Sequence, residues 1–385
     1  MTFETLRDAT SYVTALSRSG TAASCPLDAE QLTAFKDACG IQGLGPYLGW
    51  RLEHGELDVP ETIGCWVREQ LARNRARLQR MRSELILLIE TCDNVGISTI
   101  PLKGAAMLLD CPDAIGWRTM ADLDLLIPGS SPHDVDRALA GVGYRLADAS
   151  WKHRRYTARP LGLSLVVGDG EHPDNPRDVE VHDAVVEMFR GFRWDLTGAI
   201  NDRVENREGV ARPNPDAMAL HLTVHCSMSL LEGSGRAIQL IDLARALDLA
   251  GPSSVVDDVR TAGIREHARF AYPALAFVAR ELGHHRASAA MRELQPFVPE
   301  AMVEWTRAAS LYDVSWAGRN SRRLFQRHAL WALGPRERVR LLQHTLAPTR
   351  AMLANQGHDT TTLRDAFQSY RAHYRHLVRR IRSAG

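Results

Sequence analysis

Two aspartates stand two residues apart in an apolar run, Asp122-Leu-Asp124-Leu-Leu-Ile127. In a β-strand, residues i and i+2 point to the same face, so both carboxylates would lie side by side. Adjacent carboxylates repel one another unless a cation lies between them, and hard divalent cations take oxygen ligands. Aspartate is also disfavoured in strands. The pair therefore predicts a site for Mg²⁺ or Mn²⁺; the alternative is two solvated aspartates at a strand end.

Upstream of this pair, Lys103-Gly104 follows an apolar segment, 97–102, that is predicted to be a strand, and precedes a helix predicted to begin at Ala105. A glycine lets the backbone pass close to a ligand, and the helix N-terminus offers free N–H groups to an anion. The chain has only three lysines among 47 basic residues, and a compact ammonium suits a triphosphate in a tight space. The pattern predicts a phosphate site; the alternative is a solvated lysine in an ordinary turn. A phosphate site beside a divalent metal site is the minimum needed for phosphoryl chemistry on a nucleotide.

A third acidic segment, Asp178-Val-Glu180-Val-His182, alternates polar and apolar residues, which predicts a half-exposed strand with three polar side chains on one face. A two-metal site needs a third carboxylate. Glu180 is the candidate, with Asp178 as the alternative. His182 would orient Glu180, act as a base, or pack in the core. Arg118, four residues before Asp122, would neutralise phosphates or form a salt bridge with Asp122.

These segments together resemble a known superfamily. Leu102-Lys103-Gly104, the Arg118-x3-Asp122-x-Asp124 run and the later acid-plus-histidine strand are similar to the nucleotidyltransferases typified by DNA polymerase β. More narrowly, they resemble a bacterial nucleotidyltransferase-like group that is often carried in biosynthetic clusters for modified peptides and polysaccharides. The resemblance extends from about residue 83 to residue 247.

The resemblance implies roles for six residues. Asp122, Asp124 and Glu180 would be catalytic and hold Mg²⁺ or Mn²⁺, since in this group an acid two residues before a histidine is the third carboxylate. Lys103, Gly104 and Arg118 would bind a nucleoside triphosphate (NTP). The chain departs from the superfamily in having Lys103-Gly104 where a Gly-Ser turn is usual.

The implied reaction transfers a nucleoside monophosphate from an NTP to an acceptor hydroxyl or phosphate and releases pyrophosphate. A peptide or a small molecule is the favoured acceptor, whereas a tRNA end or another protein is less favoured. Two alternatives stand beside it. A glycosyltransferase also uses an Asp-x-Asp pair to hold a metal and a sugar nucleotide, although the nearby Lys-Gly turn argues against that fold. A non-catalytic accessory protein would bind a nucleotide or peptide without turnover.

The expected fold class is α+β, with a small mixed-sheet core at residues 83–200, an N-terminal helical segment at 1–82 and a C-terminal helical domain at 201–385. Helical patterns at 3–16 and 28–39, and a long one from Pro60 to about Asp93, precede the core. Strands are expected at 123–127, near 144–146, within 156–167 and at 178–182. After Pro215 the chain reads as helices, at 216–229, 237–249, 255–262, 266–282 and 288–294.

The composition is that of a globular protein, with 45% hydrophobic and 24% charged residues. Six cysteines without a CxxC pair predict free thiols in a reducing cytoplasm and no zinc knuckle. No leader and no apolar run of about 20 residues is present, so no membrane association is expected.

His221 and His225 have a spacing that can bind zinc, but no third ligand is evident, so packing or a place in the acceptor cleft is favoured.

The positive charge is concentrated at the end of the chain. Residues 301–385 contain fifteen arginines and five acidic residues, which leaves a net charge of about −9 on residues 1–300. The simplest interpretation is a solvated helical surface. The alternative is that arginines such as Arg319, Arg322, Arg323 and Arg327 guide a polyanionic acceptor to the metals. The first interpretation predicts that acceptor binding depends only weakly on salt concentration and that no stable tRNA complex forms.

Overall fold

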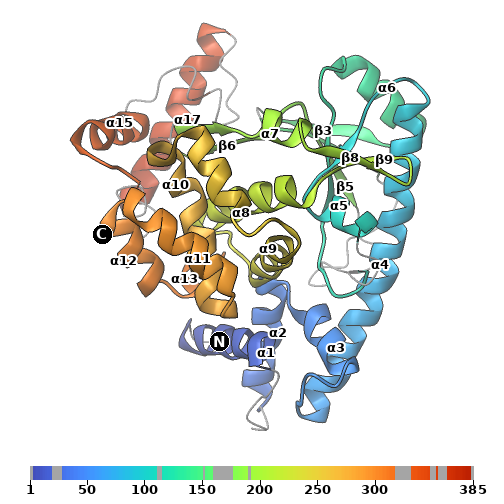
Figure 1. Cartoon of the computed structure of the whole chain (residues 1–385), viewed down its shortest axis with the longest axis vertical. Coiled ribbons are helices and arrows are strands. Elements are labelled where there is room, and N and C mark those ends of the chain that lie inside the picture. The colour runs from blue at the N-terminus through green and yellow to red at the C-terminus, as the bar shows by residue number, and fades with distance from the viewer. Residues whose placement is uncertain are drawn as a thin grey trace.

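The structure is a computed structural model that describes residues 3–19, 28–110, 115–150, 152–158, 177–189, 192–316, 331–346, 353 and 362–382. It has the expected α+β fold, with helices at both ends of the chain and small mixed sheets between them. In Figure 1 the N-terminal helices lie at the bottom, the sheet region at the upper right and the C-terminal helices at the left. The long helix α4 (Glu61–Asp93) runs along the right edge from the N-terminal helices to the sheet.

The main sheet has five strands in the order β1-β2-β5-β4-β3. Their bounds are β1 (Ile100–Pro101), β2 (Asp122–Leu126), β3 (Arg145–Ala149), β4 (Arg154–Thr157) and β5 (Asp178–His182). Only β2 and β5 are parallel; the other neighbours are antiparallel. The predicted strand at 178–182 is confirmed. The one predicted at 97–102 is reduced to two residues, because the backbone turns into the left-handed region at Lys103, with φ 47°, and helix α5 (Lys103–Asp110) begins there.

One face of this sheet is apolar. Leu123 and Leu125 of β2 and Val179 and Val181 of β5 belong to a buried cluster with α4 and with α6 (Pro132–Gly141). Helix α4 contributes its apolar stripe to this cluster, as its sequence period predicts: Leu78, Met81, Leu85, Leu88 and Ile89. Because side chains alternate along a strand, the even-numbered residues of β2 and β5 point to the opposite face.

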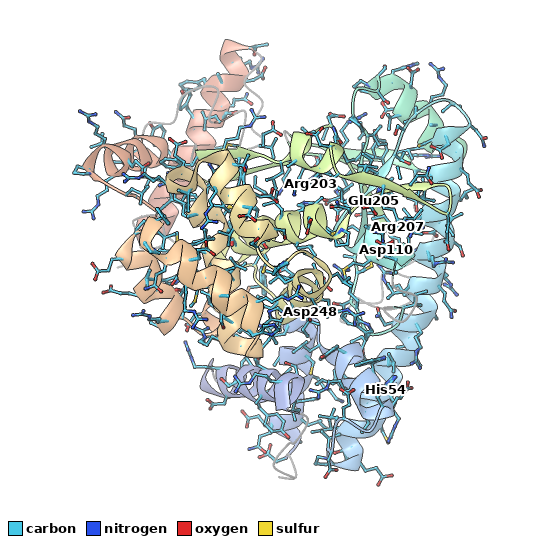
Figure 2. The ribbon with its side chains drawn as sticks, in the orientation of Figure 1. His54, Asp110, Arg203, Glu205, Arg207 and Asp248 are labelled. Atoms are coloured by element: carbon cyan, nitrogen blue, oxygen red, sulfur yellow. The ribbon has the colours of Figure 1, made fainter. Side chains whose placement is uncertain are left out.

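Two hairpins connect the sheet to the C-terminal helices: β6 (Val186–Phe189) with β7 (Phe192–Asp195), and β8 (Val204–Arg207) with β9 (Val210–Pro213). Strand β9 lies beside β1. At the end of α5, Asp110 Oδ1 is 2.6 Å from Arg212 Nη1 and 3.6 Å from Arg207 Nη1, which ties the second hairpin to this helix; Figure 2 labels Asp110 and Arg207. A short helix, α7 (Thr197–Asn201), separates the two hairpins.

The helices that follow are α8 (Pro215–Glu232), α9 (Ala237–Leu249), α10 (Ser254–Leu282), α11 (His285–Leu294), η2 (Gln295–Phe297), α12 (Glu300–Ala308), α13 (Leu311–Val314), α15 (Pro335–Leu346) and α17 (Leu363–Arg382). The predicted helix at 237–249 is confirmed. The two predicted at 255–262 and 266–282 are the arms of α10, which is interrupted at Gly263, where φ is 107°.

The N-terminal helices are α1 (Phe3–Ser19), α2 (Ala29–Gln42) and α3 (Gly45–Glu53). Asp28 caps α2, and the helix continues three residues past the predicted end at residue 39, to Gln42, where Gly43 in the left-handed conformation terminates it. The apolar residues of α1 share one buried cluster with α8 and α10, and Arg7 pairs with Asp313 of α13 at 2.9 Å. Within the described residues, no helix is long and apolar enough to cross a membrane.

Candidate active site

The register of β2 and β5 brings the predicted acidic residues together. Asp122 is paired with Asp178, Asp124 with Glu180, and Leu126 with His182. Because the strands are parallel and in this register, all four carboxylates and the imidazole leave the sheet on the face opposite the apolar cluster. The side chain of Asp124 is 8% exposed and that of Glu180 is 18% exposed. The alternative of two solvated aspartates at a strand end is therefore wrong for Asp124.

Asp124 has two close partners. Its Oδ1 accepts a hydrogen bond from Lys103 Nζ at 2.8 Å, and His182 Nε2 lies 3.0 Å from the same oxygen. Burial by itself would raise the pKa of Asp124, but Lys103 and His182 outweigh it and hold this pKa well below its ordinary value. The same ion pair has the opposite effect on the lysine. Burial would lower the pKa of Lys103, but the attraction of Asp124 exceeds this effect and raises it. Lys103 is thus a buried, charged lysine that contacts Asp124 and not a solvated one.

The pKa values of Glu180 and Asp122 are shifted in the opposite direction. Burial, and after it the charges of Asp124 and Asp122, raise the pKa of Glu180 to about 7. Burial and Asp124 likewise raise the pKa of Asp122 to about 6. The causes in both residues are burial and then the negative charge of the neighbouring acids, which Lys103, Arg118 and Lys152 offset only in part. A bound divalent cation would supply the missing positive charge, so the donor set of three carboxylates fits such an ion.

The structure adds one residue that the sequence analysis did not identify. His153 lies just before β4, and its Nδ1 is 3.4 Å from Glu180 Oε2. His182 Nε2 is 4.0 Å from the same oxygen, and the two imidazole rings are 5.4 Å apart in an edge-to-face arrangement. Burial and the neighbouring His182 lower the pKa of His153 to about 4, so its ring is neutral near pH 7. The sequence offers little signal for this residue, because its position depends on the pairing of β4 with β5.

Gly104 is required by Arg118. A Cβ atom at Gly104 would lie 2.4 Å from Nη1 and 2.7 Å from Cζ of Arg118, so only glycine leaves room for the guanidinium. Arg118 Nε donates to Asp242 Oδ2 of α9 at 2.8 Å; the side chain of Asp242 is buried and that of Arg118 is 13% exposed. Arg118 therefore pairs with Asp242 rather than with Asp122, as the salt-bridge alternative would have required. Helix α9 thereby holds the guanidinium against the start of α5.

A second charged group lies beside the acidic residues. Lys152 Nζ is 2.9 Å from both carboxylate oxygens of Glu187 in β6, and His225 Nδ1 of α8 is 3.2 Å from Glu187 Oε1. Burial alone would raise the pKa of Glu187, but His225 and Lys152 bring it below its ordinary value. Burial and the nearby Lys103 lower the pKa of His225 to about 4 and also lower that of His221. On this helix face His221 is buried and His225 is half-buried with Glu187 as its partner.

A pocket of about 250 Å³ opens next to His153. Its walls come from the turn between β3 and β4, the segment between β5 and β6, and the β6–β7 hairpin. The lining residues are Ser150, Lys152, His153, Asp183, Ala184, Val186, Met188 and Arg193. Since His153 belongs both to the pocket and to the surroundings of Glu180, the pocket adjoins the acidic residues.

The paired acids, buried lysine and adjoining pocket agree with the comparison with known families. The chain matched no curated protein and no solved structure. Residues 28–282 match a protein family that is described as "Uncharacterised nucleotidyltransferase". This range contains the whole five-stranded sheet, Lys103, Arg118 and Asp242. The chain therefore belongs to this nucleotidyltransferase family.

Proposed function

We propose that this protein is a metal-dependent nucleotidyltransferase that transfers a nucleoside monophosphate from an NTP to an acceptor hydroxyl or phosphate. The observation that supports this most is the direct pairing of Asp124 with Glu180 across β2 and β5, next to the buried ammonium of Lys103. The sheet and its flanking elements, at about residues 83–200, would form the catalytic core. The N-terminal segment 1–82 and the domain at 201–385 would enclose it.

Asp122, Asp124 and Glu180 would hold Mg²⁺ or Mn²⁺. Such an ion supplies Lewis-acid stabilisation of the charge on the reacting phosphate. The residues fit this role, because Asp122, Asp124 and Glu180 lie on the same face of paired strands and the nearby cations do not bring the pKa values of Asp122 and Glu180 back to their ordinary range.

The other site residues would act on the triphosphate. The ammonium of Lys103 would offset charge on the phosphate oxygens. Arg118, which is held by Asp242 and lies against Gly104, would also offset phosphate charge. As the acceptor oxygen bonds to the α-phosphorus, the bond from that phosphorus to the bridging oxygen breaks and pyrophosphate leaves. The acceptor hydroxyl gives up its proton in the same reaction.

The pocket beside His153 favours a small acceptor or a single side chain of a peptide. Its volume of about 250 Å³ is just below the usual range for ligand sites, about 300–1,000 Å³. Its charged residues already have protein partners: Lys152 pairs with Glu187, Arg193 with Asp195 and Asp183 with Arg154. A polyanion such as a tRNA end would gain little from a lining whose charges are balanced.

We further propose that the protein is cytoplasmic, as the cysteine pattern predicts. The free thiols at Cys39, Cys65, Cys92 and Cys226 fit a reducing compartment. Cys25 and Cys111 lie outside the described residues.

The direct test is to incubate the protein with each NTP, Mg²⁺ or Mn²⁺, and a panel of peptides and small hydroxylated molecules. We expect the intact mass of one acceptor to rise by one nucleoside monophosphate, with pyrophosphate as the second product. Release of a nucleoside diphosphate from a sugar nucleotide would instead support the glycosyltransferase alternative. Binding of an NTP without any turnover across the panel would support the non-catalytic alternative.

A further inference from the structure

Two imidazoles flank Glu180, and the nucleotidyl transfer outlined above assigns neither of them a task. We propose that His153, Glu180 and His182 form a metal site with two nitrogen donors, which binds a transition ion such as Mn²⁺ or Zn²⁺ in preference to Mg²⁺. The site shares Glu180 with the proposed active site. The inference therefore rests on the proposed function for its biological meaning, although metal binding itself is measured without turnover.

The spacing of the donor atoms suits one ion. Glu180 Oε2 lies 3.4 Å from His153 Nδ1 and 4.0 Å from His182 Nε2, and one donor atom from each residue falls within 4.8 Å of the others. Ligands about 2.1 Å from a tetrahedral ion are separated by about 3.4 Å. The separation of His153 from Glu180 already has this value, and shortening the others by up to about 1.4 Å through side-chain rotation would bring all three donors to a common centre.

Hydrogen bonding does not account for the position of His153. Its Nδ1 is buried and has no hydrogen-bond partner among the residues that the structure describes, although a carboxylate oxygen is only 3.4 Å away. A buried polar nitrogen without a partner is unfavourable. A cation between the two atoms would turn this unfavourable contact into a favourable one.

The tautomer of His182 determines whether its Nε2 can bind the ion. His182 Nε2 lies 3.0 Å from Asp124 Oδ1, and this contact is a hydrogen bond only while Nε2 carries the ring proton. When the proton moves to Nδ1, the Nε2 lone pair becomes available to an ion, and the clustered donors are those of His153, Glu180 and His182. The three named residues leave at least one coordination position for a substrate, as catalytic sites with two histidines and one glutamate do.

Nitrogen donors decide which ion is preferred. Mg²⁺ is a hard ion that requires oxygen ligands in near-octahedral geometry, whereas imidazole suits Zn²⁺ and other transition ions, among which Mn²⁺ is the weakest binder. The fold also keeps His153 in place: the pairing of Arg155 with Glu180 aligns β4 with β5, and Lys152, the preceding residue, is anchored on Glu187. Both histidines are thus positioned by long-range contacts and not by the turn alone.

The experiment is a titration of the full-length protein with Mn²⁺, in which electron paramagnetic resonance measures the bound and free ion. We expect Mn²⁺ to stay bound in about a hundredfold excess of Mg²⁺, and pulsed spectra to show nitrogen hyperfine coupling from imidazole. His153→Ala should weaken Mn²⁺ binding about tenfold or more and reduce the nitrogen coupling. His133→Ala is the matched control, since His133 is an exposed histidine of α6, and it should change neither quantity.

Two outcomes would overturn the inference. One is Mn²⁺ binding without nitrogen coupling, and the other is displacement of Mn²⁺ by an equal concentration of Mg²⁺; either would leave the carboxylate site and the proposed function standing. His182 is buried, so a His182→Asn variant is used as a second test only if its circular dichroism spectrum matches that of the parent protein. If the spectra differ, the conclusion is drawn from His153→Ala alone. Nitrogen coupling in a protein that transfers no nucleotide would support the metal site and contradict the proposed function.

Discussion

Asp124 of β2 and Glu180 of β5 are directly paired across two parallel strands, so their carboxylates leave the same face of the sheet. The relationship depends on the register, because a slip of one residue would turn one carboxylate toward the apolar cluster under α4. Lys103 reaches the same face from the start of α5 and donates to Asp124. Three segments that are far apart in the chain thereby form one small charged site.

The first prediction concerns the acidic pair. Asp124→Asn keeps the shape of the side chain but removes its charge, so we expect nucleotidyl transfer to fall by more than about tenfold, or about 1.4 kcal/mol in the barrier. Pyrophosphate release measures the rate, and circular dichroism checks the fold. Asp148→Asn, on the exposed edge strand β3, is the control and should keep the parent rate. An Asp124→Asn variant as active as the control would refute the assignment.

Lys103 tests the triphosphate role. Removal of this buried ammonium by Lys103→Ala should raise the KM for the NTP and lower kcat, since a charge that offsets the phosphates is lost. Lys103→Arg should restore activity only in part, because the guanidinium is larger and its charge is more spread. Steady-state kinetics with varied NTP separate the two constants. Full recovery with arginine would mean that charge alone matters at this position.

A methyl group at Gly104 should act through Arg118. Gly104→Ala would place Cβ against a guanidinium that Asp242 holds, so we expect a loss of about 1–3 kcal/mol in the free energy of unfolding. Gly141→Ala is the control, because a Cβ there meets no atom of the described residues within 4 Å. Urea denaturation measures both. Combining Gly104→Ala with Arg118→Ala should cost less than the sum of the single changes, and strict additivity would contradict the proposed clash.

The pair formed by Lys152 and Glu187 predicts a pH-dependent stability. Because the pKa of Glu187 lies below its ordinary value of 4.5, its contribution to the free energy of unfolding is complete above about pH 4.5 and declines as the pH falls. Glu187→Gln should therefore lower the free energy of unfolding by about 1–3 kcal/mol at pH 7. The difference in this free energy between the variant and the parent protein should become smaller as the pH falls below about 4.5. Thermal unfolding of both proteins between pH 7 and about pH 3.5 tests this. A difference that is constant with pH would show that the carboxylate charge is not the cause.

The arginines at the end of the chain give the last prediction. Arg336, Arg338, Arg371 and Arg375 are exposed, whereas Arg319, Arg322, Arg323 and Arg327 lie outside the described residues. If these arginines only form a solvated helical surface, acceptor turnover will change little between low and physiological salt concentration, and no stable tRNA complex will form. Contacts to several phosphates would instead produce a steep log–log dependence of binding on salt concentration. A titration at several salt concentrations distinguishes the two.

Much of the local structure follows from the sequence. The alternation in Asp178–His182 predicts β5 and its polar face, and the apolar period of residues 60–93 predicts α4. The Asp28 side chain likewise identifies the start of α2. These features depend on neighbours within one or two turns or a single strand, so the residue pattern alone carries them. The same pattern singled out Asp122, Asp124, Glu180 and Lys103 as the candidate site.

The partners of these residues were decided only by the tertiary structure. Arg118 reaches Asp242 and not the nearby Asp122, Lys152 reaches Glu187, and His153 approaches Glu180. Each of these contacts joins segments whose distance in space is set by strand order, register and helix packing, and no local pattern encodes that distance. The sequence by itself therefore determined which groups could do the chemistry. Long-range packing, which aligns β4 and β5 and brings α8 and α9 to the sheet, decided which of them meet.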